Sequence, residues 1–286
     1  MAFYEEADST GIVEDHIQAV LHLEESEASR VLFRYQDIRK DLIDRLSRIP
    51  PGTINAAHLR GVLAQVNGAV EAMTKHLAGE TIDSSYKAAL SANEDLLSET
   101  RVFDEQFLGY VTPINLNAAL LADDTANFLV DRYQTNLAAY GNDLMTQISN
   151  GLFSASIGEK SSEEVVGSIS QFFTAEEWKL RRIVRTELHN VYNLAKIQGM
   201  KTIDDQIPGS RLMKTLMHPL DDRTGKDSMY AARLNLVAGI TEPFEYMWLG
   251  KLRQFLCPPD RPNDRAILVP YRPEWGKAQG GAFIPQ

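Results

Sequence analysis

Three stretches near the carboxyl end decide the fold: 217-MHPLDDRTGKDSMY-230, 240-ITEPFEYMW-248 and 257-CPPDRPNDRAILVPY-271. They combine prolines, aspartates and glycines, which favour turns and end helices, with short apolar and aromatic runs that are typical of strands. Upstream, apolar residues recur at three- and four-residue steps along most of the chain. We therefore predict a mainly α protein with a C-terminal α+β module, in which a bundle of long helices precedes a small, turn-rich, β-containing domain.

Helical periodicity predicts four helices in the first 160 residues. Pro50-Pro51-Gly52 ends the first of them, because two successive prolines remove backbone donors and exclude helical geometry. Gly79 and Gly151 are expected to end the second and the fourth. The predicted helices lie at 12–49, 53–79, 83–97 and 115–150.

Beyond a predicted linker at 158–162, Thr174 and Glu177 match a capping box. The pattern predicts a short helix before Thr174 and a longer helix after it, which Gly199 closes. Strand-like runs follow at 211–217, 246–256 and 267–271, with a short helix at 229–236. The predicted domains are 1–160, a helical domain for assembly and partner binding, 161–271, the α+β module, and 272–286, an extended arm.

Charge is distributed unevenly along the chain. The net charge is −10, made up of −16 over residues 1–177 and +6 over residues 178–286. This asymmetry suggests different partners for the two ends, and the overall acidity argues against a protein that coats DNA. The single cysteine, Cys257, excludes an internal disulfide framework. No signal-peptide pattern and no apolar run of about 20 residues is present, so we expect synthesis in the cytoplasm and no membrane partner.

Short motifs follow one another in a characteristic order between residues 176 and 271. They are Arg185-Thr186-Glu187, Asp222-Arg223-Thr224, Pro243-Phe244, Pro258-Pro259 and Asn263-Asp264-Arg265. This series resembles the tailed-phage head morphogenesis proteins, a group of minor capsid proteins that includes the F protein of phage Mu. The family often ends its motif with Asn-Cys-Arg-Cys, whereas this chain continues with Ala266, so any role for paired cysteines is absent here.

The resemblance implies a non-enzymatic structural protein of the virion, located in the capsid interior or at the portal vertex. Its implied partners are the portal protein and other capsid or scaffold proteins, with packaged DNA as a further candidate. The implied role is head assembly and genome packaging or ejection, without a cofactor or a small-molecule substrate.

The charged motif residues have a structural interpretation of their own. Arg185 and Glu187 are two residues apart on a predicted helix and therefore do not face each other. Glu187 is expected to take Arg223 or Arg265 as a partner, since a guanidinium holds a carboxylate with two parallel hydrogen bonds. We predict that Arg185, Glu187, Asp222, Arg223 and Arg265 hold the turn-rich module onto its helix.

Two alternatives remain open. One is a phage-encoded, metal-dependent nuclease or transferase that uses Asp222 and His218, although no nucleophile, metal-ligand spacing or Gly-rich phosphate loop supports it. The other is a DNA-binding or partner-binding surface on the basic face of the helix. The residues of that face are Arg181, Arg182, Arg185, His189 and Lys196.

Overall fold

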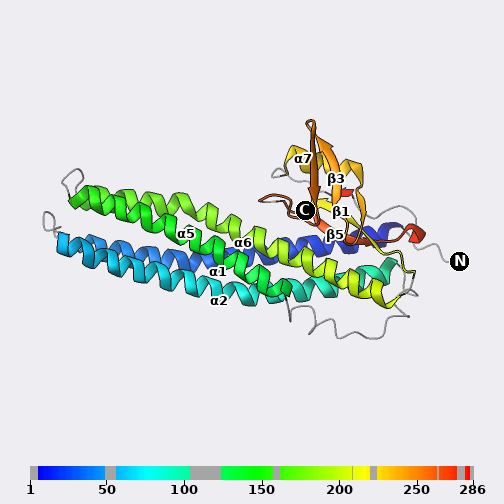
Figure 1. The fold of residues 1–286 in the computed structure, drawn as a ribbon, viewed down its shortest axis with the longest axis horizontal. Coiled ribbons are helices and arrows are strands. Elements are labelled where there is room, and N and C mark those ends of the chain that lie inside the picture. Colours follow the sequence, from blue (N-terminus) through cyan, green and yellow to red (C-terminus); the bar gives the residue numbers. More distant parts are fainter. Residues whose placement is uncertain are drawn as a thin grey trace. The chain divides into compact units, whose positions relative to one another are not determined.

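The computed structural model confirms the predicted fold class: long helices are followed by a small C-terminal sheet (Figure 1). It describes residues 6–48, 56–103, 124–156, 162–207, 209–219, 224–262, 264–275 and 281–283. The long helices are α1 (Glu6–Ser47), α2 (Ala56–Phe103), α5 (Asp124–Ser156) and α6 (Ser162–Gln206). In this part of the chain, no helix is long and apolar enough to cross a membrane.

The strands of the C-terminal module form two separate sheets among the described residues. The larger sheet has the strand order β2-β1-β5, and both β2 and β5 are antiparallel to β1. Strand β6 pairs in parallel with the C-terminal end of β1. The smaller is the β3–β4 hairpin. The bounds are β1 Met213–Pro219, α7 Lys226–Leu234, β2 Val237–Gly239, β3 Phe244–Trp248, β4 Lys251–Phe255, β5 Ile267–Tyr271, the 3-10 turn η1 Pro273–Trp275 and β6 Gly281–Phe283.

The chain forms two compact units that do not follow the predicted domain boundary at residue 160. The module unit combines residues 1–25, 84–127 and 185–286, and the helical unit combines 26–83 and 128–184. The difference arises because α1, α2 and α6 are each long enough to contribute one segment to each unit. The α+β module therefore folds together with segments from the N-terminal half of the chain.

Aromatic side chains form the centre of the helical unit. The Tyr35 ring lies 5.3 Å from that of Phe173 and 6.0 Å from that of Tyr140. Tyr140 donates a 2.6 Å hydrogen bond to the Tyr35 hydroxyl, which donates in turn to the Phe173 carbonyl at 3.3 Å. Burial raises the pKa of both phenols. These contacts join α1, α5 and α6 through groups whose polar atoms are satisfied internally.

An apolar cluster joins the helices of the module unit to its sheet. Helix α2 contributes Leu96, and α6 contributes Met200 and Ile203. These side chains pack with Leu216 of β1 and Leu268 of β5, all of them nearly inaccessible to solvent. The sheet thus buries one face against helices, which is the arrangement that stabilises a small antiparallel sheet.

Four predicted helix boundaries are wrong, at Gly79, Thr174, Gly151 and Gly199. Gly79 lies inside α2, which runs without interruption to Phe103. Thr174 lies inside α6, where its hydroxyl donates to the Ser170 carbonyl instead of capping a new helix. A capping signature has no effect where the preceding residues already continue the helix and tertiary packing supports it. Helix α5 likewise continues past Gly151 to Ser156.

The tail is only in part the extended arm that was predicted. Residues 281–283 form β6 and pair with 217–219 of β1. The Trp275 ring lies 5.5 Å from that of Phe103 at the end of α2. Both contacts anchor the tail within the module unit.

Gly199 does not end α6 but allows it to approach α2 closely. A Cβ atom at this position would lie 2.6 Å from Leu96 Cδ2 and 3.1 Å from Asn93 Oδ1. We expect Gly199→Ala to lower the free energy of unfolding by about 1–3 kcal/mol through overpacking. Gly79→Ala is the matched control, since a Cβ there meets nothing within 4 Å, and it should stabilise by about 0.5–1 kcal/mol. Urea denaturation of both variants tests this difference in sign, and a stabilised Gly199→Ala protein would contradict it.

Candidate functional site

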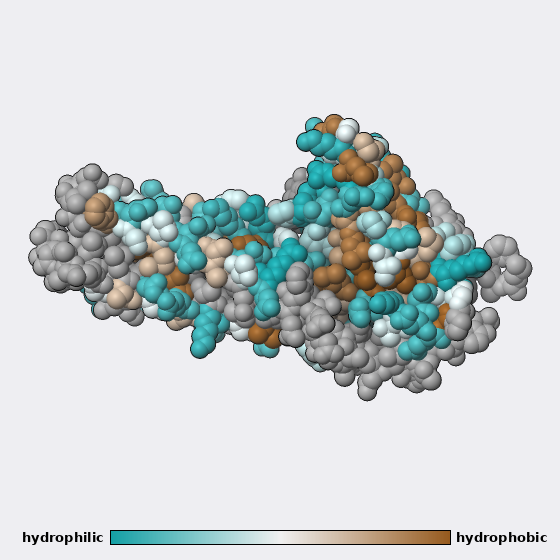
Figure 2. Space-filling view, viewed as in Figure 1, coloured by the Kyte–Doolittle hydropathy of each residue, from teal (hydrophilic) through white to brown (hydrophobic). Residues whose placement is uncertain are grey.

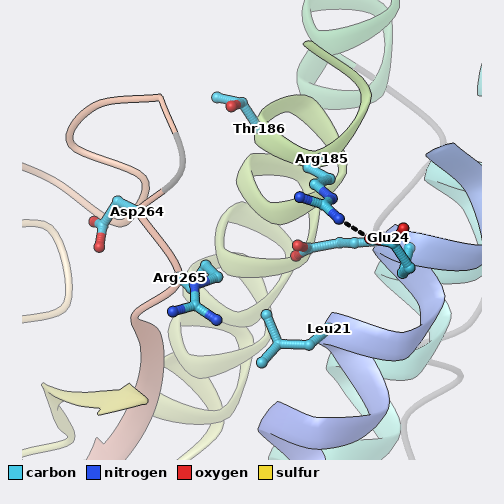
Figure 3. Close-up of a pocket in the computed structure, with 7 residues that line it drawn as sticks. Leu21, Glu24, Arg185, Thr186, Asp264 and Arg265 are labelled. Carbon is cyan, nitrogen blue, oxygen red and sulfur yellow. Dashed lines mark ion pairs between the residues drawn. The ribbon is translucent and has the colours of Figure 1, made fainter. Parts of the chain in front are cut away.

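A cavity of about 530 Å³ in the module unit collects several of the motif residues (Figure 3). Helix α1 contributes three lining residues, the middle of α6 two, and the segment before β5 two. The lining residues are Leu21, Glu24, Glu25, Arg185, Thr186, Asp264 and Arg265. The cavity therefore brings Arg185-Thr186 and Asp264-Arg265 together, and it adds a face of α1 that sequence reasoning did not identify.

Arg185 forms an ion pair with Glu25 of α1 (Figure 3). The side chains are 25% and 44% exposed, so solvent screens the pair and its net contribution to stability is small. Arg185 was predicted to help hold the turn-rich module onto its helix. The ion pair with Glu25 connects α1 and α6, and the predicted contact of Arg185 with the module stays a prediction.

Arg265 and Thr224, which belong to two different motifs, are in contact. Arg265 Nη2 donates to Thr224 Oγ1 at 3.4 Å, and that hydroxyl donates to the Pro219 carbonyl at 2.9 Å. Asp222, Arg223 and Asn263 lie outside the described residues, so the expected contacts of Asp222 and Arg223 remain predictions. Glu187 is buried on α6.

Asp264 shapes the loop that leads into β5. Its carboxylate is buried and accepts hydrogen bonds from the Asp260 amide at 3.2 Å and the Ala266 amide at 3.4 Å. The Asp264 amide donates to the Arg261 carbonyl. A short carboxylate that accepts from nearby backbone amides holds a turn, so this motif residue orders the loop beside the cavity.

The buried ring of His189 on α6 contacts Glu24 of α1 and the segment directly before β5. Nδ1 lies 2.5 Å from Glu24 Oε1, and Nε2 lies 2.6 Å from the carbonyl oxygen of Ala266. Both neighbours are acceptors, so the ring satisfies both contacts only as a doubly protonated imidazolium. Burial disfavours that cation, but the Glu24 carboxylate and the two hydrogen bonds outweigh burial and raise the pKa of His189.

Asn193 and Lys196 continue from His189 along the same face of α6. Asn193 Oδ1 accepts from the Leu268 amide at 2.8 Å. Lys196 Nζ donates to the Leu268 carbonyl at 3.0 Å and to Glu99 Oε1 at 2.6 Å. We call His189, Asn193 and Lys196 the polar ladder, because together they bind the backbone of Ala266 and Leu268, at the start of β5, on the side away from β1.

The polar ladder protects the edge of the sheet. Strand β5 ends the β2-β1-β5 order, so among the described residues no further strand pairs with its outer amides and carbonyls. Covering such an edge with a helix satisfies these groups and prevents pairing with another chain. The side chains of α6 therefore take the place of a further strand.

The predicted basic surface is wrong at His189 and Lys196. Both side chains are buried and bound to β5 or to acidic partners, so neither can reach DNA. Arg181 and Arg182 are half-buried, and the Arg182 guanidinium lies 4.6 Å from the centroid of the Trp178 ring. The sequence pattern of a basic stripe on a helix is the same whether the stripe faces solvent or packs against the edge of a strand.

A second polar cluster surrounds Arg261. Its guanidinium contacts Asp260 at 2.7 Å, Asp227 at 2.9 Å and the Ser228 hydroxyl. The pKa of Asp260 is raised to about 6, mainly because the carboxyl is buried and also because the negative charge of Asp264 is close to it. The positive charge of Arg261 thus offsets part of the repulsion between the neighbouring carboxylates of Asp227 and Asp260.

His218, which the enzymatic alternative uses together with Asp222, is buried next to this cluster. Burial lowers its pKa, so the ring is neutral at pH 7. Its expected partner Asp222 is not among the described residues. Within the described ranges, no three His, Cys, Asp or Glu residues are grouped so that they could hold a metal ion.

Of the central motif Pro243-Phe244, Phe244 belongs to the core, whereas Pro243 is exposed. Phe244 is buried, and Lys214 Nζ lies 5.1 Å from the centroid of its ring. The same ammonium group donates to the carbonyls of Ile240 and Leu256, each at 2.8 Å. Burial lowers the pKa of Lys214 to about 8. This buried lysine was not identified from the sequence, because its acceptors are backbone carbonyls that leave no sequence signal.

Fold and site together define a mainly helical protein with a C-terminal α+β module, in which Arg185 pairs with α1, Asp264 and Thr224 hold loops, and the polar ladder binds the edge of β5. Comparison with protein-family models, curated proteins and solved structures finds no match for this chain.

Proposed function

We propose that this protein is a non-enzymatic minor capsid or head morphogenesis protein of a tailed phage. It would act at the portal vertex inside the head, in head assembly and in genome packaging or ejection. The ordered motif series between residues 176 and 271 supports this assignment, since it resembles that family. The long helices offer extended surfaces suited to contacts with other proteins.

The observation that carries the non-enzymatic part is the internal use of polar side chains. His189 and Lys196, the buried basic residues of α6, bind β5 and acidic partners. Asp264 holds a loop through backbone amides, and Thr224 bonds Arg265 and Pro219. A catalytic group must reach substrate, whereas these groups stabilise the fold.

The test is co-purification with the portal protein encoded by the same phage genome. We expect the full chain, tagged and produced in phage-infected cells, to retain the portal protein through washing at moderate salt. A portal-free eluate, from a protein that is folded and present during infection, would overturn the assignment.

The enzymatic alternative makes a separate prediction about Asp222 and His218. It requires a metal-dependent activity on DNA that Asp222→Ala abolishes while the protein stays folded. We expect neither the wild type nor the variant to cleave duplex or single-stranded DNA with Mg²⁺ or Mn²⁺. Cleavage by the wild type that is lost in a folded Asp222→Ala protein would replace the structural assignment with an enzymatic one.

A further inference from the structure

The cavity between α1, α6 and the segment before β5 has a charged and polar lining. Six of its seven lining residues are polar, and Leu21 is the apolar one. All seven belong to the module unit. Figure 2 shows hydrophilic side chains along the long helices and hydrophobic ones gathered over the C-terminal module. Sites for small organic ligands are lined mainly by apolar and aromatic side chains, so this lining fits a charged group better than such a molecule.

The charges around the cavity balance one another. The lining carries three carboxylates and two guanidinium groups, from Glu24, Glu25, Asp264, Arg185 and Arg265. His189 supplies a third cation behind Glu24, because its two ring nitrogens face two acceptors and satisfy both only as an imidazolium. Three negative charges therefore meet three positive ones.

The three carboxylates differ in how firmly the fold holds them. Glu24 is buried beside His189, and Asp264 is buried and accepts from two backbone amides. Glu25, in contrast, is 44% exposed and pairs with Arg185, which is 25% exposed. An exposed ion pair contributes little to stability, so another carboxylate can replace Glu25 at little cost.

The two guanidinium groups reach the cavity from different elements. Arg185 lies on α6 and Arg265 lies before β5, and Figure 3 draws both side chains around the cavity. A guanidinium carries five donors in a planar fork that matches the two oxygens of a carboxylate. Glu25 already places one such carboxylate at Arg185. If Glu25 turns out to solvent, the cavity keeps one net positive charge, which a single incoming carboxylate balances.

We infer that this cavity binds the side-chain carboxylate of an Asp or Glu from a partner protein, which displaces Glu25 from Arg185. Arg265 favours the same anion from the other side of the cavity. Nucleic acid fits less well, because three carboxylates line the cavity and affinity for DNA comes from neutralising many phosphates. The site stands independently of the proposed function, because its test uses an acidic peptide in place of the portal protein.

The test is calorimetric titration of the full chain at low salt with hexaglutamate blocked at both ends, and with hexaglutamine as the neutral comparison. Glu25→Gln removes the internal competitor and should tighten binding of hexaglutamate about 2- to 5-fold. Arg185→Gln should weaken binding about 10- to 100-fold, because charge-assisted hydrogen bonds are lost. Both variants should unfold close to the wild-type temperature, since the pair that they break is exposed. The matched control is Arg253→Gln, which removes an exposed arginine of β4 and should leave affinity nearly unchanged.

Each outcome decides for or against this site. Tighter binding by Glu25→Gln together with weaker binding by Arg185→Gln supports it. A folded Glu25→Gln protein that binds no hexaglutamate, or binds it no more tightly than the wild type, overturns it. Equal losses of affinity in Arg185→Gln and Arg253→Gln would mean general attraction to positive charge, which also overturns it. Succinate or inorganic phosphate that binds more tightly than hexaglutamate, with the same dependence on Arg185, would replace the protein carboxylate with a free small anion.

Discussion

Replacing Lys196 by Met is expected to lower the free energy of unfolding by about 3–5 kcal/mol, the usual cost of removing one member of a buried ion pair. The Lys196 and Glu99 side chains are both 0% exposed, and Nζ lies 2.6 Å from Oε1. Without the ammonium group, the contact that remains to Glu99 among the described residues is that of His16 Nδ1 with the same oxygen, at 2.9 Å. The Leu268 carbonyl on the sheet edge also loses the donor provided by Lys196.

The measurement is equilibrium unfolding in urea for three proteins. Lys179→Met is the matched control, because Lys179 is 40% exposed and pairs with Glu176 one helical turn away, and it should change stability by no more than about 0.5 kcal/mol. The double variant Lys196→Met with Glu99→Leu should recover part of the loss, since no unpaired buried charge remains there. If Lys196→Met and Lys179→Met were equally mild, the polar ladder would not stabilise the fold as described.

The stabilisation that His189 contributes is expected to fall as the pH rises above about 6.5. Its folded-state pKa is raised, whereas the unfolded value is about 6.5. The folded state therefore binds the proton more tightly. The resulting stabilisation is fully present below about pH 6.5 and is lost as the pH rises through the folded pKa. Each unit of raised pKa corresponds to about 1.4 kcal/mol.

Other groups titrate in overlapping pH ranges, so a variant is needed to isolate the contribution of His189 to the pH dependence of stability. The pKa of Asp260 is raised to about 6. The stability that this group contributes at acidic pH is therefore lost as the pH rises through 6, before neutrality is reached. The lowered pKa of His218 acts in the opposite direction, since its stabilisation is lost as the pH falls below about 6.5. Lys214, lowered to about 8, adds stability as the pH rises between about 8 and 10.5.

The decisive comparison is therefore wild type against His189→Gln between pH 6.5 and 8. At pH 6.5 the variant should be less stable by about 3–5 kcal/mol, because Glu24 keeps its buried charge without a cation. The difference should narrow as the pH rises, while His218→Gln, used as a control, should show no such narrowing above pH 7. A gap between wild type and His189→Gln that stays constant with pH would mean that His189 is neutral in the folded protein.

Much of the local structure could be predicted because it depends on neighbours in sequence. The run 267–271 was predicted as a strand and is β5, and the predicted helix at 229–236 overlaps α7. The prolines and glycines between them produced the predicted turn-rich module. Helix ends were predicted poorly, as Gly79 and Thr174 show, because packing along a whole helix outweighs one weak local signal.

The candidate site was only partly predictable. Arg185, Thr186 and Arg265 were identified from motif order and do line one cavity. Leu21, Glu24 and Glu25 were missed, since their segment lies more than 150 residues from Arg185 and looks like an ordinary acidic helix.

The sequence by itself determined the mainly helical character, the turn-rich carboxyl end and the uneven charge, because spacing and backbone preference act over a few residues. Tertiary structure alone decided which charged side chains are accessible to solvent or to a partner. His189 and Lys196 share a helix face with Arg185, yet both are buried against β5 while Arg185 remains partly exposed. Whether a cation meets solvent, a carboxylate or a strand edge depends on segments 70 to 165 residues away, which only the folded chain brings together.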